Sequence, residues 1–417
     1  MSETPALARR LGTLDAVLIG LGSMIGAGVF AAFTPAAAAA GSGLLIGLLV
    51  AAFVAFCNAS SSAQLAAAYP ASGGSYLYGR ERIGPWAGFL AGWGFVIGKT
   101  ASAAAMAMTF AAYVAPPGWE RPVAILAVIA LAAVNYHGIT RTARLTRILM
   151  VLVLAALTLI VAACWAGSSP DPGKIVGEGL LAHGWYGILQ SAGLLFFAFA
   201  GYARIATLSE EVREPRRTIP RAILIALAVT AVVYAAVAVT LLATLGPSGI
   251  AAEPAPLAAA VASGTAGWAT PVVRAGAAVA ALGALLALIA GLGRTSLAMA
   301  REHDLPHWLA AVHPRYRVPH RAEVAGAVAI CGIIAVADLR GAIGFSSFGV
   351  LIYYLVANLA AFTQNGADRR YPRVFQVLGA LACVALAATL PLPSVVAGAA
   401  VFAVGIVVRW IRITRTS

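Results

Sequence analysis

The fold is decided by the stretch Gly22-Ser23-Met24-Ile25-Gly26-Ala27-Gly28-Val29-Phe30, which places three glycines inside an apolar run. Glycine costs a helix about 1 kcal/mol relative to alanine, and in lipid every freed backbone N–H or C=O needs a partner. Such a stretch is tolerated only where the unwound backbone faces protein or an aqueous cavity. An interrupted helix exposes carbonyls and a half-helix N-terminus, which together can hold a small zwitterion or an ion. The stretch therefore indicates a carrier.

The composition around this stretch is that of a protein that crosses a membrane many times. Of the 417 residues, 61% are hydrophobic and only 10% are charged. The net charge of +13 does not indicate nucleic-acid binding, because the basic residues lie in short loops between apolar runs, where they set topology. The four cysteines lie in apolar runs without metal-ligand spacing, so we interpret them as small buried hydrophobes. No metal or cofactor is expected.

Twelve apolar runs are long enough to cross a bilayer, which takes about 20 residues. They are 14–37, 43–67, 86–114, 121–138, 145–166, 184–208, 219–245, 272–298, 321–339, 342–363, 374–390 and 392–410. If the N-terminus is cytoplasmic, only a few basic residues lie outside: Arg121, Lys174, Arg274 and Arg340. Lys99 and Arg204 lie within spans, and all others of the 28 Lys and Arg lie inside. Cytoplasmic loops show this asymmetry, so we predict a multi-pass cell-membrane protein with residues 1–13 and 411–417 in the cytoplasm.

A second glycine interrupts the sixth predicted span, in Phe196-Phe197-Ala198-Phe199-Ala200-Gly201-Tyr202. The two breaks are five spans apart, so spans 1–5 (14–166) and spans 6–10 (184–363) read as two copies. Because five is odd, the second copy is inverted, as in many secondary transporters with a midplane site at the repeat interface. The alternative is that the glycines only allow close helix packing, since the chain has 43 of them.

These motifs together resemble the amino acid–polyamine–organocation superfamily. The first break is similar to the family's first-span motif, and three further stretches agree in order: Tyr69 to Tyr78, Ser209 to Pro220, and Arg294 to Arg301 with Asp304 to Pro306. The stretch after span 6 is most similar to the cationic-amino-acid-transporter branch. The resemblance covers nearly the whole chain. It implies an all-α polytopic membrane protein of about 12 transmembrane helices, with a 5+5 inverted-repeat core, interrupted helices 1 and 6, and two peripheral helices at 374–410.

The resemblance also implies where a substrate amino acid is held, namely against the two breaks. The residues carried over are Met24, Ile25, Gly26, Ala27, Gly28, Phe197, Ala198, Phe199, Ala200, Gly201 and Tyr202. The amides of Ala27 and Gly28 should meet the substrate carboxylate at a half-helix N-terminus. Carbonyls of Met24, Phe197 and Ala200 should accept from the ammonium. Aromatic side chains at 197, 199 and 202 would form a wall or gate, with ordinary bundle packing as the alternative.

Lys99 lies near the middle of the third predicted span, where an unpaired charge is costly. No Asp or Glu lies deep in any predicted span, so no carboxylate partner is evident. Burial could favour the neutral amine, the partner could be a mobile substrate carboxylate, or the amine could donate to backbone carbonyls at a break. Intramembrane charges are functional by default, so we predict a coupling or gating role for Lys99. For Arg204 and Glu211, about two helical turns apart, we predict a cytoplasmic gate pair, with snorkelling of Arg204 as the alternative.

The chain departs from the family at positions used for coupling and selectivity. Residues 148–165 contain no lysine, although similar proton-coupled members carry one in span 5. Residues 275–293 contain no Ser or Thr, although sodium-coupled relatives place hydroxyls in span 8. Ala203 stands where members that select cationic substrates often carry an acidic residue. We therefore predict a neutral amino acid as substrate, with an acidic one second, and protons or plain exchange as the means of coupling.

Two other classes of function are weighed against an amino acid transporter. A channel or receptor predicts continuous helices and a polar stripe along one span, and the sequence shows neither. A membrane-embedded enzyme needs paired acids, an activated nucleophile or metal ligands. All six histidines lie at loops or span ends without metal-ligand spacing. The expected partners are thus a small-molecule amino acid, protons and the lipid bilayer, not nucleic acid, and the number of subunits is left open.

Overall fold

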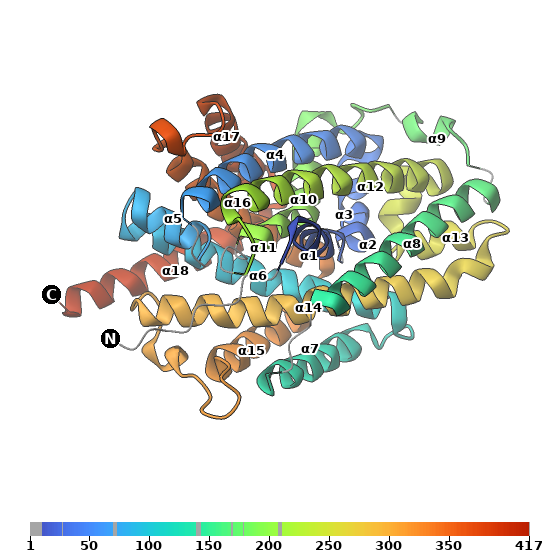
Figure 1. Ribbon diagram of the computed structural model, residues 1–417. Helices are drawn as coiled ribbons and strands as arrows, with labels where there is room; N and C mark the ends of the chain where they lie inside the picture. The colour runs from blue at the N-terminus through green and yellow to red at the C-terminus, as the bar shows by residue number, and fades with distance from the viewer. Residues whose placement is uncertain are drawn as a thin grey trace.

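The computed structural model describes residues 11–26, 28–69, 73–138, 143–167, 170–177, 179–206 and 211–416. Its α-helices are α1 (Thr13–Ile25), α2 (Gly28–Ala31), α3 (Phe33–Ala40), α4 (Leu44–Ala68), α5 (Ser75–Arg82), α6 (Pro85–Val114), α7 (Glu120–Tyr136), α8 (Ala143–Gly167), α9 (Gly173–Val176), α10 (Gly184–Phe199), α11 (Ala203–Ala206), α12 (Pro215–Ala252), α13 (Pro256–Ala262), α14 (Thr270–Arg301), α15 (His320–Val336), α16 (Leu339–Phe362), α17 (Arg373–Thr389) and α18 (Leu392–Thr416). The long helices form one bundle, with α5 at one end and α9 and α13 at the other (Figure 1). Within the described ranges the chain has no strand beyond an isolated bridge between Leu11 and Val212.

Every predicted span corresponds to a helix of the bundle. In the described part of the chain, nine helical stretches are long and apolar enough to cross a membrane. The helices α7, α15 and α17 have 17 residues each, which is near the lower limit of a span. The class of polytopic all-α membrane protein is therefore confirmed, whereas the count of twelve stays a prediction.

The predicted interruptions of the first and sixth spans are both present. Helix α1 ends at Ile25, and α2 begins again at Gly28 after a backbone turn at Gly26 with φ −38° and ψ −104°. Ala27, which carries one of the predicted carboxylate amides, lies outside the described residues. In the sixth span, α10 gives way to a 3₁₀ turn, η2 (Ala200–Tyr202), and then to the short helix α11. The interrupted pair is confirmed.

The glycines of the two breaks allow those breaks to pack directly on each other. A Cβ atom on Gly201 would lie 2.2 Å from the carbonyl oxygen of Ser23, and one on Gly28 would lie 2.6 Å from the Cβ of Ala198. A Cβ on Gly26 would lie 2.7 Å from the Cβ of Ala284 on α14. Close packing therefore explains why these positions are glycine, and for Gly28 and Gly201 the packing is between the two breaks.

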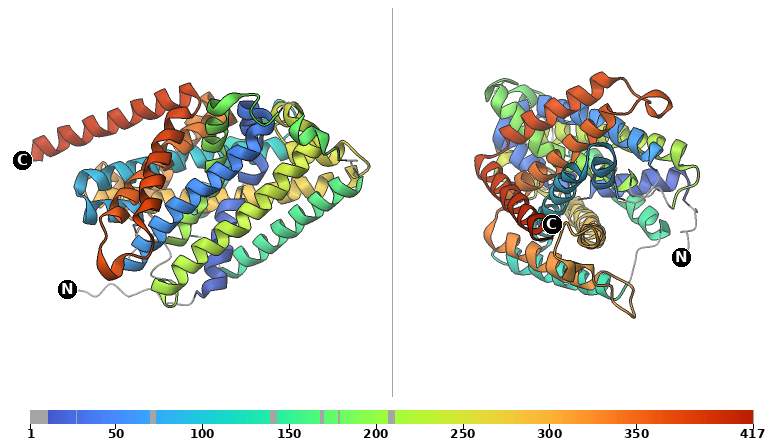
Figure 2. Two further views of the ribbon diagram at one scale, coloured as in Figure 1. Left: turned by 90° about the horizontal axis from the view of Figure 1, so that it is seen from above. Right: turned by 90° about the vertical axis from the view of Figure 1, so that its left-hand side faces the viewer.

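A buried carboxylate joins three elements at the end of the bundle that carries α5. Asp304, which follows α14, accepts hydrogen bonds from the Tyr76 hydroxyl at 2.8 Å and from Arg80 at 3.1 Å, and it pairs with Arg409 of α18. Burial and the bond to Asp304 raise the pKa of Tyr76 above its usual range. The Arg409 guanidinium lies 4.7 Å from the ring centre of Phe89. These contacts hold α18, which runs along the outside of the bundle and extends beyond it (Figure 2).

Candidate substrate site

A cavity of about 800 Å³ ends at the two helix breaks. Its walls come mainly from α1, α6, α8 and α14, with further residues from the η2 turn, α11 and single positions on α5, α7, α10 and α16. The lining residues of the first span, Ile19 to Gly26, precede its break or lie at it, and among the described residues none comes from α2 or α3. From α10 only Phe197 contributes. The cavity therefore approaches the breaks from one side of the bundle, the side on which α1 begins.

The other side of the breaks is filled by packed side chains. The Tyr113 hydroxyl donates to the carbonyl of Phe30 at 3.0 Å, and the two rings meet edge to face at 5.6 Å. The ring of Phe33 meets Tyr234 in the same manner at 6.3 Å. Since Phe30, Phe33 and Tyr113 are each at most 1% exposed, this side of the bundle is closed.

The structure brings about half of the predicted binding residues to the cavity wall. Those that line the cavity are Ile25, Gly26, Phe197, Ala200 and Gly201. Those that do not are Met24, Gly28, Ala198, Phe199 and Tyr202, which are buried behind the wall. The predicted gating residues Lys99, Arg204 and Glu211 also line it. Their assignment to binding or gating stays a prediction, but the two breaks and the three charges do share one cavity.

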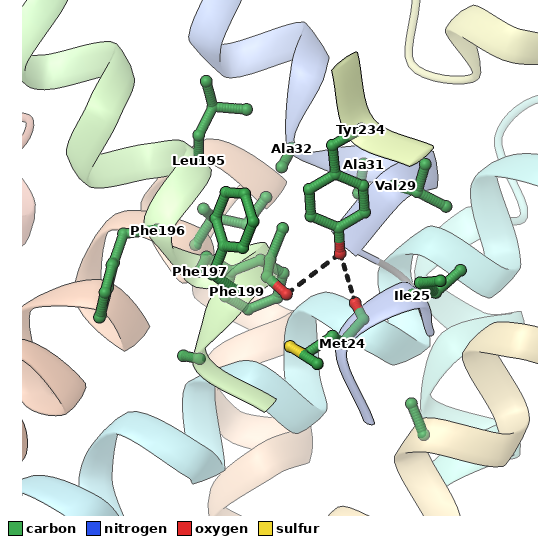
Figure 3. Packing of buried hydrophobic residues seen from close by; sticks show 14 of the residues in the cluster. Met24, Ile25, Val29, Ala31, Ala32, Leu195, Phe196, Phe197, Phe199 and Tyr234 are labelled. Carbon is green, nitrogen blue, oxygen red and sulfur yellow. Dashed lines mark hydrogen bonds between the residues drawn. The ribbon is translucent and has the colours of Figure 1, made fainter. Parts of the chain in front are cut away.

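The sequence did not single out Tyr234 of α12, which joins the two breaks. Its side chain is fully buried, and its hydroxyl lies 2.6 Å from the carbonyl oxygen of Met24 and 3.1 Å from that of Ala198. Figure 3 shows both bonds as dashed lines, with Met24 on one side of the hydroxyl and Phe197 and Phe199 near the other. The unwound backbone exposes these carbonyls, and the single O–H of Tyr234 lies within hydrogen-bond distance of both and can donate to either. Tyr234 therefore sets the separation of the breaks.

Removing this hydroxyl is expected to loosen the site more than the bundle. In Tyr234→Phe the ring still packs on Phe33 and Phe199, but two buried carbonyls lose a donor, at a cost of about 1–3 kcal/mol. We expect substrate affinity to fall while the protein remains monodisperse, as measured by equilibrium binding and gel filtration. Tyr186→Phe is the matched control, because that tyrosine is 60% exposed. Wild-type affinity in Tyr234→Phe would mean that the bridge is dispensable.

The carbonyl of Ala200 in the second break is also occupied by protein donors. It accepts from the Tyr354 hydroxyl at 3.1 Å and from the Lys99 amine at 3.4 Å. Lys99 thus makes the contact that the backbone-carbonyl alternative foresaw, and its amine lies 6.0 Å from the ring centre of Phe95. Two of the three carbonyls predicted to accept from a substrate ammonium, those of Met24 and Ala200, already accept hydrogen bonds within the protein.

Of the three predicted wall aromatics, only Phe197 faces the cavity. Phe199 packs edge to face on Tyr234, with the ring centres 5.0 Å apart, and Tyr202 stacks on Tyr354 at the same distance. Both are fully buried. The packing alternative therefore describes Phe199 and Tyr202, and the wall interpretation remains open for Phe197 alone.

The charged side chains of the cavity are mainly positive. Lys99, Arg204 and Arg294 line it, with Glu211 as their acidic counterpart in the described chain. Both Arg294 and Glu211 act electrostatically on Arg204. The predicted pair thus lies in the same cavity as a third charge, Arg294, which the sequence presented only as part of a motif. A ligand in this cavity would experience a net positive field.

A helical membrane bundle with two interrupted spans at the end of a one-sided cavity defines the class of membrane carriers. The sequence pattern of the amino acid permease family matches residues 11–414, so the chain belongs to this family, within the amino acid–polyamine–organocation superfamily. It is a multi-pass membrane transporter, and amino acids are its class of substrate.

Three relatives illustrate the range of the family. An uncharacterized transporter of Mycobacterium tuberculosis is 59% identical over 97% of this chain and 92% of its own length. The branched-chain amino acid permease BcaP of Bacillus subtilis is 24% identical over 91% of this chain and 85% of its own. The cationic amino acid transporter 7, chloroplastic, of Arabidopsis thaliana is 26% identical over 88% of this chain and 66% of its own.

Proposed function

We propose that this protein is a secondary active transporter that moves a neutral amino acid across the cell membrane by alternating access. The observation that carries the proposal is the one-sided cavity, which ends at the two helix breaks and is closed beyond them by Phe30, Phe33 and Tyr113. With both termini in the cytoplasm, as the distribution of Lys and Arg predicts, the cavity opens to the cytoplasm. Two inverted halves, 14–166 and 184–363, would exchange the open and closed sides.

The substrate would bind through its α-amino and α-carboxyl groups at the breaks. The amides of Ala27 and Gly28 would meet the carboxylate, where the helix dipole favours negative charge. The carbonyls of Met24, Phe197 and Ala200 would meet the ammonium. Each carbonyl oxygen has two lone pairs, so the ammonium can share Met24 and Ala200 with their present donors or displace them. Where the carbonyls are shared, the Tyr234 and Lys99 contacts would persist in the bound state and keep the spacing of the breaks.

The charges of the cavity support a neutral substrate, with an acidic one second. A cationic side chain would face Lys99, Arg204 and Arg294 with only Glu211 to offset them among the described lining residues. Ala203 supplies no acidic group beside the second break. The relative named for branched-chain amino acids agrees with this choice, and the one named for cationic amino acids does not. The charges line this chain's own cavity, so they bear on its substrate more directly than the names of its relatives do.

Substrate choice is testable by exchange in proteoliposomes. Purified protein would be reconstituted with an unlabelled amino acid inside, and uptake of each labelled amino acid would be measured, with protein-free liposomes as the control. We expect a neutral amino acid to have the highest kcat/KM and the cationic ones the lowest. Saturable arginine or lysine transport that exceeds every neutral amino acid would overturn the proposed selectivity.

Coupling would use protons or plain exchange, and we assign Lys99, Arg204 and Glu211 to coupling or gating. All three side chains line the cavity, and Lys99 contacts the second break directly. In one state of the cycle Arg204 and Glu211 would close the cytoplasmic opening as an ion pair. In the state described here both residues line the cavity.

A further inference from the structure

A second, smaller cavity of about 260 Å³ lies beside the substrate cavity, among α7, α14 and the start of α15. Its polar lining residues include Asn135, Arg294, Arg317 and Glu323. Arg294 and Asn135 also line the substrate cavity, so one guanidinium and one amide are shared by both. The small cavity is large enough for water molecules, which need about 30 Å³ each in the liquid.

Glu323 is the unusual side chain of this small cavity. The residue is 4% exposed, and its Oε2 atom has no hydrogen-bond partner in the described chain. The fold makes room for it, because a Cβ on Gly293 of α14 would lie 2.7 Å from the Glu323 Cγ. A buried ionised carboxylate with an unpaired oxygen is unfavourable, so the group gains by taking up a cation.

The surrounding charges select the kind of cation. Arg294 of α14 and Arg317 of the connection between α14 and α15 line the cavity together with Glu323. Tyr316 of the same connection is a further titratable lining residue. His320 and Arg321 lie one helical turn or less away on α15, while α7 contributes the neutral Asn135. Neither α6 nor the turn η4 (His307–Ala310) contributes a lining residue. Arg294 acts electrostatically on Glu323 and would repel a metal ion, but a proton binds to the carboxylate covalently and removes its charge.

We propose that Glu323 is a proton-binding site linked to the substrate cavity through Arg294. The step is the uptake of one proton by the carboxylate, which becomes a neutral carboxylic acid. The ionised carboxylate attracts Arg294 toward the small cavity, and the protonated acid releases it toward Glu211 in the substrate cavity. By linkage, a substrate or conformation that draws Arg294 away favours protonation of Glu323, and protonation of Glu323 favours that substrate or conformation by the same free energy.

This inference rests on the proposed transport function and adds to it a proton site separate from Lys99. Lys99 acts at the breaks, whereas Glu323 lies behind Arg294 and touches neither break in the described structure. The two assignments therefore predict different effects for Lys99→Ala and Glu323→Gln. Glu323→Gln should bind substrate with the affinity of the protonated wild-type protein at every pH, because it keeps the shape of the side chain and removes only its capacity to bind a proton.

The first experiment compares two modes of transport in proteoliposomes. At equal pH on both sides, Glu323→Gln should exchange neutral amino acids at the wild-type rate. Under a gradient of one pH unit, wild type should accumulate substrate up to about tenfold for one proton per substrate, and Glu323→Gln should not accumulate it. The matched control is Glu81→Gln, an exposed carboxylate on α5. Wild-type accumulation in Glu323→Gln would overturn the proposal.

The second experiment detects the proton without transport. Infrared difference spectra of wild type between neutral and acidic pH should contain a carboxylic acid band that is absent in Glu323→Gln. Glu323→Asp, which keeps a titratable carboxyl, should retain a shifted band and serves if the glutamine variant does not fold. Arg294→Gln should bring the band in at higher pH, because the ionised carboxylate loses a positive neighbour. Absence of a Glu323-dependent band would overturn the site, whereas its presence in a protein that exchanges no amino acid would overturn the proposed function alone.

Discussion

A single methyl group at position 201 is expected to abolish amino acid transport. In Gly201→Ala the new Cβ would lie 2.2 Å from the carbonyl oxygen of Ser23 and 2.6 Å from the amide nitrogen of Met24. Both atoms belong to the backbone, so no side-chain rotation relieves the contact and the two breaks must separate. The carbonyl of Met24 would then move relative to Ala198, and Tyr234 could no longer bridge them. The substrate would lose the groups that hold its ammonium.

The effect of Gly201→Ala is measured as substrate binding and as exchange in proteoliposomes, after gel filtration has shown a monodisperse protein. Gly332→Ala on α15 is the control, because a Cβ there meets nothing within 4 Å. Gly28→Ala provides a second variant if the first does not fold, since the contact it creates is with the small Ala198 side chain as well as backbone. A well-folded Gly201→Ala or Gly28→Ala protein with wild-type affinity would show that substrate does not bind at the breaks.

The interrupted helices were predictable because three glycines close together weaken a helix inside an apolar run. A bilayer leaves no partner for freed backbone groups, so the break in Gly22 to Phe30 had to face protein or water. The same reasoning located the break at Gly201. It did not identify which neighbour satisfies the freed carbonyls, because Tyr234 and Tyr354 lie in other spans. In sequence, a tyrosine within an apolar run is indistinguishable from one that only packs.

The sequence assigned three aromatic residues to the cavity wall, but only Phe197 lines it, for a geometric reason. Successive residues of an α-helix are about 100° apart, so Phe197 and Phe199 point about 200° apart and cannot share one wall. Tyr202 follows in the 3₁₀ turn and stacks on Tyr354 instead. For the same kind of reason the sequence did not reveal Glu323, since a carboxylate at the start of a predicted span reads as a residue at the interface. Its burial depends on Gly293 of α14, which is distant in sequence.

Loss of the Lys99 amine is expected to have the second large effect, on coupling and on affinity together. Lys99 is 8% exposed, lines the substrate cavity, and donates to the Ala200 carbonyl within the second break. In Lys99→Ala this carbonyl loses the amine and keeps the Tyr354 hydroxyl, and the cavity loses a positive charge. A hydrogen bond to a charged group contributes about 1.5–3 kcal/mol, so substrate affinity should fall about tenfold or more.

The outcome separates Lys99 from Lys174, the other lysine of the chain. Lys174→Ala is the matched control, because the Lys174 amine also donates to a backbone carbonyl, that of Thr244 at 3.1 Å, but lies far from the breaks in α9. Under an imposed pH gradient we expect Lys99→Ala to lose accumulation and to retain exchange at weakened affinity, whereas Lys174→Ala should match wild type. The weakened affinity also distinguishes Lys99→Ala from Glu323→Gln, which should lose accumulation alone. If Lys99→Ala accumulates substrate like wild type, the amine is a structural group that donates to the Ala200 carbonyl, and coupling must reside elsewhere in the protein.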